Sequence, residues 1–340
     1  MSESRKLPLL LLGLLSMTYA EVFSGASPGW IFDPASWILP FPLYWSHVVF
    51  FLGLAVRYRR TSLAHLYLWG ILFGLYETWV TKVVWAGFFD SPPLIGPILG
   101  FAIFEAVVIV LFWHPIFSFI LPVLTFELMA YSSDNSALLL PGHVEWLIPR
   151  RRITRVFQVL VLIGGANLAN GCGNDLLLSL LTGAGSVGLV YIVYRLATRG
   201  DKKFSIESVT VGRRGLLLSG GFIVFLYLTT LIAIRPESIP GPGTLLLTIQ
   251  IYAIVAALLH ASPTEPVELQ SVGGVTLVEL RWFWRTMVYF LLFTAVFSLL
   301  PVLDMVVVVG GLLIMFGLGP LVLLSALFRL WRRPDYRRGW

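Results

Sequence analysis

Long apolar runs, repeated almost from end to end, constrain this 340-residue chain more than any other feature. An α-helix rises about 1.5 Å per residue and the hydrocarbon core of a bilayer is about 30 Å thick, so about 20 apolar residues are enough to cross it. With 57% hydrophobic and 12% charged residues, the chain carries more apolar surface than a soluble core of this size hides. The sequence therefore predicts an all-α polytopic integral membrane protein.

The apolar runs predict ten transmembrane helices in a single transmembrane domain over residues 1–340. We expect the stretch 101–130 to be one long tilted helix, bent at Pro115 and Pro122, because two crossings there would send later basic residues to the opposite side. The alternating stretches 204–211 and 275–280 fit an inner β-ribbon or irregular loops equally well. The ten predicted spans are 8–23, 37–56, 63–88, 101–130, 154–170, 176–197, 214–234, 244–261, 283–300 and 305–330.

The basic residues predict the orientation of these helices. With the N-terminus inside, 22 of the 24 Lys and Arg residues lie in loops or helix ends on the inner side, and only Lys82 and Arg235 do not. Such an asymmetry is typical of membrane proteins whose basic loops stay in the cytoplasm. The sequence therefore predicts a multi-pass protein of the cell membrane with both termini cytoplasmic.

The same distribution of charge predicts which kinds of molecule the protein contacts. A net charge of +6 would suggest nucleic acid in a soluble protein, but here the basic residues separate apolar runs, so we expect membrane lipids and no nucleic acid as partners. The single cysteine, Cys172, excludes an intrachain disulfide and any CxxC motif. The sequence points to no cofactor and leaves the oligomeric state open.

Three ionisable residues stand deep inside predicted helices. Glu77, His114 and His47 each lie roughly 15 to 20 Å below the outer end of their span, at a depth where ionisable groups are costly and usually functional. Because consecutive helices tend to be neighbours, we expect Glu77 and His114 to face each other, with His47 near, in a cavity open to the outer side. They are the candidate catalytic residues. The alternative is a protonated Glu77 bonded to Tyr76 or to the backbone, beside neutral histidines satisfied within the bundle.

A second group of polar residues is predicted nearer the outer surface. Lys82 and Glu105 lie roughly 9 Å and 6 Å below it, and we expect them to form an ion pair. Asn167 and Asn170 end the span 154–170 and are candidates to line a cavity, or else belong to an ordinary polar turn. These four are the candidate substrate-binding or relay residues, whereas Glu127 is expected at the inner interface. No HExxH motif supports a metal site.

Three sequence patterns carry a family resemblance. They are Glu21-Val-Phe-Ser-Gly-Ala-Ser-Pro28, Glu77-x4-Lys82 and His114-x3-Ser118-x3-Pro122-x4-Glu127. Together they resemble a family of uncharacterised prokaryotic multi-pass membrane proteins over the first 130 residues. This resemblance implies a membrane fold and brings no activity with it.

A more distant resemblance concerns a glutamate and a histidine on consecutive helices. It is similar to the CAAX-prenyl-protease and bacteriocin-processing family of intramembrane glutamic proteases, in which a Glu-Glu-x3-Arg motif activates water. Glu77 matches the first glutamate, but Thr78 stands in place of the second and Lys82 in place of the arginine. The third motif of that family is matched at most by Asn170-x3-Asn174. These departures put the paired-glutamate chemistry in doubt.

Three classes of function follow from these residues. An intramembrane hydrolase would use Glu77 as a base whose environment favours proton transfer near neutral pH. A proton-coupled transporter or flippase would use Glu77, Glu105, Lys82 and His114 as a relay or gate. A structural subunit of a membrane assembly would leave the same groups paired and sealed. The substrate classes that remain open are lipids, peptides and small molecules.

Overall fold

The computed structural model describes residues 3–89, 91–200, 202–265, 269–270, 272 and 276–332. Every regular element in these residues is a helix, and the only β-type pairing among them consists of two isolated bridges, Ile98 with Phe101 and Leu139 with Gln270. The all-α prediction is therefore confirmed. The inner β-ribbon is wrong in its described part, because residues 206–209 form a short helix; residues 273–275 lie outside the described residues.

The helices are of three types. Two of them are π-helical, η1 (Thr18–Val22) and η2 (Val107–Ile120), and η3 (Pro236–Ser238) is a 3-10 turn. The α-helices are α1 (Glu3–Met17), α2 (Pro34–Ile38), α3 (Pro40–Arg57), α4 (Leu63–Gly74), α5 (Tyr76–Trp79), α6 (Val83–Ala86), α7 (Ile103–Ala106), α8 (Leu121–Ser133), α9 (Val144–Leu147), α10 (Arg151–Gly171), α11 (Leu176–Ala197), α12 (Ile206–Val209), α13 (Arg213–Ala233), α14 (Pro242–Ala261), α15 (Leu280–Leu299) and α16 (Pro301–Trp331).

Seven helical stretches of the described chain are long and apolar enough to cross a bilayer, and they coincide with seven of the ten predicted spans. One of them, over residues 103–133, is the single long helix predicted there. The prediction of an unbroken helix over 63–88 is wrong: α4 ends at Gly74 and two four-residue helices follow. The break before α6 occurs at Lys82, which adopts the left-handed conformation with φ of 60°.

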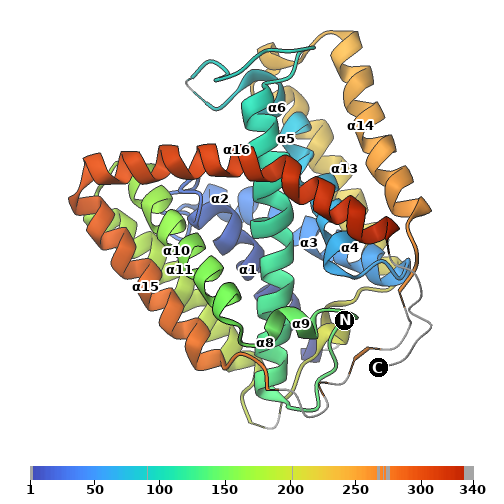
Figure 1. Ribbon diagram of the computed structural model, residues 1–340, viewed down its shortest axis with the longest axis vertical. Coiled ribbons are helices and arrows are strands. Elements are labelled where there is room, and N and C mark those ends of the chain that lie inside the picture. Colours follow the sequence, from blue (N-terminus) through green and yellow to red (C-terminus); the bar gives the residue numbers. More distant parts are fainter. Residues whose placement is uncertain are drawn as a thin grey trace.

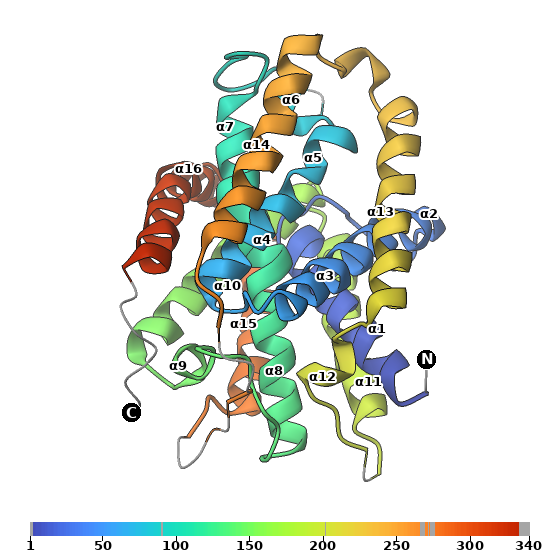
Figure 2. The ribbon, with the colours of Figure 1, turned by 90° about the vertical axis from the view of Figure 1, so that its right-hand side faces the viewer.

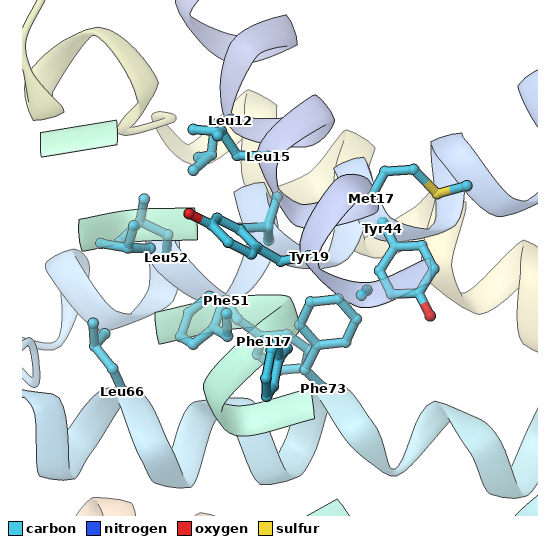
Figure 3. Close-up of a cluster of buried hydrophobic side chains, with 14 of the residues drawn as sticks. Leu12, Leu15, Met17, Tyr19, Tyr44, Phe51, Leu52, Leu66, Phe73 and Phe117 are labelled. Atoms are coloured by element: carbon cyan, nitrogen blue, oxygen red, sulfur yellow. The ribbon is translucent and has the colours of Figure 1, made fainter. Parts of the chain in front are cut away.

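The helix formed by α7, η2 and α8 runs along the long axis of the molecule, and α16 crosses it (Figure 1). On one side, α10, α11 and α15 pack together; on the other, α4 packs along η2, and α13 and α14 lie at the periphery (Figure 2). The buried core gathers around α1, α3, α4 and η2, where Leu15, Tyr44, Phe73 and Phe117 lie close together (Figure 3).

Two prolines remove backbone donors from the long helix, and side-chain hydroxyls from neighbouring helices donate hydrogen bonds nearby. Proline has no N–H, so Pro115 and Pro122 leave the carbonyls four residues earlier without their usual α-helical donor. The Tyr67 hydroxyl donates to Leu111 O at 2.5 Å, and the Ser16 hydroxyl donates to Ser118 O at 2.7 Å. Hydroxyls from α4 and α1 thus stabilise the irregular stretch where a backbone bond is missing.

Two glycines of α4 allow it to approach this stretch closely. A Cβ on Gly70 would collide with the backbone of Pro115, and a Cβ on Gly74 would lie 2.9 Å from the Cβ of His114. Small residues four apart on a membrane helix permit such close packing. The Gly70-x3-Gly74 pair therefore sets the distance between α4 and the histidine of η2.

Candidate functional site

Glu77 and His114 face each other in the middle of the molecule. Glu77 lies in α5, just after the break in the α4 helix, and His114 lies in η2. Glu77 Oε1 and His114 Nε2 are 3.1 Å apart, and both residues are buried, with 7% and 2% of their surface exposed. The predicted contact between the two residues is present.

Hydroxyl groups bond to the second ring nitrogen of His114 and to the second carboxylate oxygen of Glu77. His114 Nδ1 is 2.7 Å from the Ser118 hydroxyl, one helical turn further along η2, and the Thr81 hydroxyl donates to Glu77 Oε2. The result is a hydrogen-bonded row from Ser118 through His114 and Glu77 to Thr81. Serine, histidine and a carboxylate in this order resemble a catalytic triad in composition, but the Ser118 side chain is fully buried.

A second carboxylate, Glu21, lies beside this row, and the sequence interpretation missed it. Glu21 Oε2 accepts a hydrogen bond of 2.5 Å from the Ser27 hydroxyl, and its Oε1 accepts one from the Tyr44 hydroxyl. The Tyr44 and Tyr76 hydroxyls are 2.5 Å apart, and the Tyr76 ring packs edge-on against the His114 ring at 5.0 Å. The signal available was the Glu21-to-Pro28 pattern, which the sequence analysis used only for the family resemblance.

All three ionisable residues of this site stand where a helix is irregular. Glu21 lies in η1, His114 in η2, and Glu77 in the short α5 after the break. π-helical segments are rare and occur frequently at functional sites. No group of three or more His, Cys, Asp or Glu side chains gathers as a metal site in the part of the chain that the structure describes.

His47 is near the pair but does not bond to it. Its ring packs at 5.4 Å from the Tyr76 ring, while its Nδ1 donates to Leu43 O at 2.7 Å and its Nε2 is 3.0 Å from the Tyr227 hydroxyl. Since a carbonyl can only accept, Nδ1 carries a proton, and both ring nitrogens have a partner. His47 therefore fits the alternative interpretation, a ring satisfied within the bundle.

The predicted ion pair between Lys82 and Glu105 is wrong. The Lys82 ammonium donates to the carbonyls of Thr230, at 2.7 Å, and of Ile234 at the end of α13. Glu105 Oε1 instead accepts from the Leu94 N–H at 3.0 Å. The left-handed backbone at Lys82, which an ideal helix does not contain, turns its side chain toward α13 and away from the acid.

The two predicted asparagines bond to different parts of the chain. Asn167 donates to Phe23 O at 3.2 Å, next to the loop that follows Glu21. Asn170 is bonded to Asp304 in α16, at 3.3 Å, and takes no part in the Glu77 site.

A further cluster surrounds Glu127, near the other end of the same long helix. Glu127 Oε2 is 2.5 Å from His143 Nδ1, its Oε1 accepts from the Leu140 N–H, and His143 Nε2 is 2.8 Å from Thr61 O. Glu127 is fully buried within the protein, because the loop over residues 134–149 folds back over the helix end. Its position at the inner membrane interface stays a prediction.

Opposing effects act on the pKa of His143 in this pair. Burial alone would lower the pKa of His143, but the charge and hydrogen bond of Glu127 and the bond to Thr61 O raise it, and the net shift is upward. His65 lies in the same region, with its ring nitrogens 2.8 Å and 3.0 Å from the hydroxyls of Ser62 and Ser262 and 3.4 Å from Glu265. Two histidine–carboxylate pairs thus occupy this end of the molecule.

Comparison with known proteins places the chain in a family. A model of an uncharacterized membrane protein family matches residues 10–332, nearly the whole chain. The protein belongs to this family. An uncharacterized protein of Archaeoglobus fulgidus is 41% identical over 133 residues, which are 38% of this chain and 40% of that relative. No solved structure matches the chain. The membrane location and the family resemblance are confirmed, whereas the likeness to intramembrane glutamic proteases stays a prediction.

Proposed function

We propose that this protein is a proton-coupled membrane transporter whose protons move along the helix made of α7, η2 and α8. Three ionisable groups on that helix carry the proposal. Glu105, His114 and Glu127 are nine and thirteen residues apart, which corresponds to roughly 14 Å and roughly 20 Å along a helix axis. Together they extend over most of the thickness of a bilayer, as a path that reaches both faces requires.

Each of the three groups is buried and bonded to a different part of the chain. Glu105 meets the loop before α7, His114 meets α5, and Glu127 meets the loop after α8. Ionisable groups inside membrane helices are rare and mark ion and proton pathways. A purely structural role would not need three such costly groups on one helix.

The middle group has the chemistry to hold and pass protons. Glu21 and Glu77 come from different helices and are surrounded by Tyr44, Tyr76 and His114, all of which donate and accept hydrogen bonds. Hydrogen-bonded chains of this kind polarise one another and let a proton change position with small shifts of the heavy atoms.

The broken helix supports a transport cycle. Discontinuous membrane helices at a buried polar site are a recurring feature of secondary transporters. Here α4, α5 and α6 replace one predicted span, and the break stands directly before Glu77. A hinge at this position would expose Glu77 to one side or the other.

We further infer ten crossings with both termini in the cytoplasm. Three predicted spans are not among the seven long apolar helices: α1 with η1, the broken stretch α4 to α6, and α10. If all three cross, 22 of the 24 basic residues lie on one side, and this asymmetry supports the inference.

Hydrolysis within the membrane is a second candidate, favoured by the row Ser118, His114 and Glu77. In that mechanism His114 would take the proton of the Ser118 hydroxyl as it attacks a carbonyl, and Glu77 would stabilise the charged ring. Ser118→Ala separates the two candidates. It would abolish hydrolysis and leave a proton path through Glu77 in place.

Reconstituted liposomes test the transport proposal. Liposomes with a trapped pH-sensitive dye are given an inward-driving membrane potential, with and without a small-molecule extract of the source cells outside. We expect the wild type to acidify the interior and Glu77→Gln to reduce the rate at least about tenfold, because the amide keeps the volume and cannot exchange a proton. Glu207→Gln, the same change at an exposed residue of α12, is the matched control and should keep the wild-type rate.

The outcomes separate the three classes of function. Flux that depends on Glu77 supports transport. A wild-type protein that gives no more flux than protein-free liposomes under both conditions would contradict it and favour the hydrolase or the structural role. An equal rate of acidification for Glu77→Gln and the wild type would show that Glu77 is not part of the proton path.

A further inference from the structure

Asp304 is a buried acid without a cationic partner in the described chain. It lies in the first turn of α16 with none of its surface exposed. Its Oδ2 accepts hydrogen bonds from the side-chain amides of Asn174, at 2.9 Å, and Asn170, at 3.3 Å. Its Oδ1 has no hydrogen-bond partner among the described residues. A buried carboxylate in this state needs a positive counter-charge or a proton.

Polar groups from two further helix ends meet Asp304. Asn174 Nδ2, which bonds to Asp304 Oδ2, is also 3.4 Å from Phe297 O, in the last turn of α15. The oxygen and nitrogen of a side-chain amide have nearly the same shape, so an amide that rotates to face a cation offers its oxygen where its nitrogen now lies. A cation beside Asp304 would then have carboxylate, amide and Phe297 carbonyl oxygens as ligands.

The surrounding helix ends favour a cation beside an ionised Asp304. The C-terminal ends of α10 (Arg151–Gly171) and α15 (Leu280–Leu299) both reach this point, and such ends carry partial negative charge. Asp304 itself stands at the N-terminal end of α16, which favours the ionised carboxylate. Carbonyls at helix ends coordinate sodium in membrane transporters in the same way.

We infer that Asp304, Asn170, Asn174 and the Phe297 carbonyl form a binding site for a hard monovalent cation of the Na⁺ type. Oxygen-only ligands select hard cations, and the one carboxylate neutralises one positive charge. Asn170 and Asn174 are half-buried, so an ion can enter from the surface. This site is separate from the Glu77 cluster and stands independently of the proposed transport.

Thermal unfolding of the detergent-solubilised full-length protein tests the site. The melting temperature is measured in choline chloride, sodium chloride and calcium chloride at matched ionic strength. We expect sodium to raise Tm by about 5 °C over choline, because a ligand that binds only the folded state stabilises it. Asp304→Asn should abolish this rise and should not lower Tm in choline, since it removes an uncompensated buried charge.

A second variant keeps the test decisive if Asp304→Asn does not fold. Asn174 has a positive φ of 59°, which aspartate tolerates, so Asn174→Asp adds a second carboxylate with little strain. Two carboxylates should shift the response from sodium to calcium. Equal Tm values in the three salts for the wild type, a response to calcium alone, or a sodium response that persists in Asp304→Asn would each overturn the inference.

Discussion

At the scale of residues, three of the buried acids of this protein are paired with histidines. Glu77, Glu127 and Glu265 each lie beside a histidine, whereas lysine and arginine pair with acids, in the described chain, only at Asp134 and Glu279 on the surface. Histidine is the side chain that most often takes up and gives off protons in proteins, so it is the partner that a proton path requires.

The His143–Glu127 pair predicts a pH dependence of stability. Because the pKa of His143 is raised in the folded protein, its stabilising contribution is fully present below the ordinary pKa of about 6.5 and is lost as pH rises through the folded value. We expect Tm of the wild type to fall as the pH rises above about 6.5. Glu127→Gln should flatten this dependence, because the amide still bonds to His143 without its charge. A wild-type Tm that does not fall as the pH rises would contradict the prediction.

Part of the site could be predicted from single residues. Glu77 and His114 were predicted together because equal depth on consecutive helices needs only the helical rise. Glu21 was not proposed as a site residue, and the direction of the Lys82 side chain was predicted wrongly. Glu21 lies in the π-helix η1, and Lys82 itself adopts the left-handed conformation before α6. Neither irregularity has a signature in the residue types alone.

At the scale of elements, the contact of α4 with η2 holds the site together. Gly70 and Gly74 place α4 directly against Pro115 and His114. The Tyr67 hydroxyl of the same helix donates a hydrogen bond to the Leu111 carbonyl, near Pro115. The sequence indicated that 101–130 is one helix, from the position of later basic residues. It did not indicate the break after Gly74, because residues 63–88 are mostly apolar and their polar members His65, Glu77, Thr78, Thr81 and Lys82 do not mark a helix end.

This contact gives a prediction for Gly70→Ala. The added Cβ would meet the Pro115 backbone, which cannot move aside as a flexible side chain does, so we expect the free energy of unfolding to fall by about 1–3 kcal/mol. The measurement is thermal or denaturant unfolding in detergent. Gly310→Ala is the matched control in a long helix, since its Cβ would meet nothing within 4 Å. Equal losses for the two variants would show that the close approach at Gly70 does not matter.

At the scale of the whole molecule, the account depends on which loops face which side of the membrane. The single native cysteine is buried, so Cys172→Ser provides a background for labelling single introduced cysteines. Leu94, before α7, and Lys203, before α12, are both exposed and belong to opposite sides in the predicted orientation. We expect a membrane-impermeant thiol reagent to label Leu94→Cys in intact cells and Lys203→Cys only after permeabilisation. Labelling of Lys203→Cys in intact cells would overturn the ten-span topology.

The central claim is that the polar cluster around Glu77 and the cluster around Glu127 belong to one proton path. Proton flux into liposomes is therefore compared for Glu77→Gln, Glu127→Gln and the double variant. Groups in series each limit the whole path, so the account predicts that either single change removes most of the flux and that the double variant is no worse than the more severe single one. Wild-type flux in Glu127→Gln, with flux lost in Glu77→Gln, would contradict a continuous path and leave Glu77 and His114 as an isolated site.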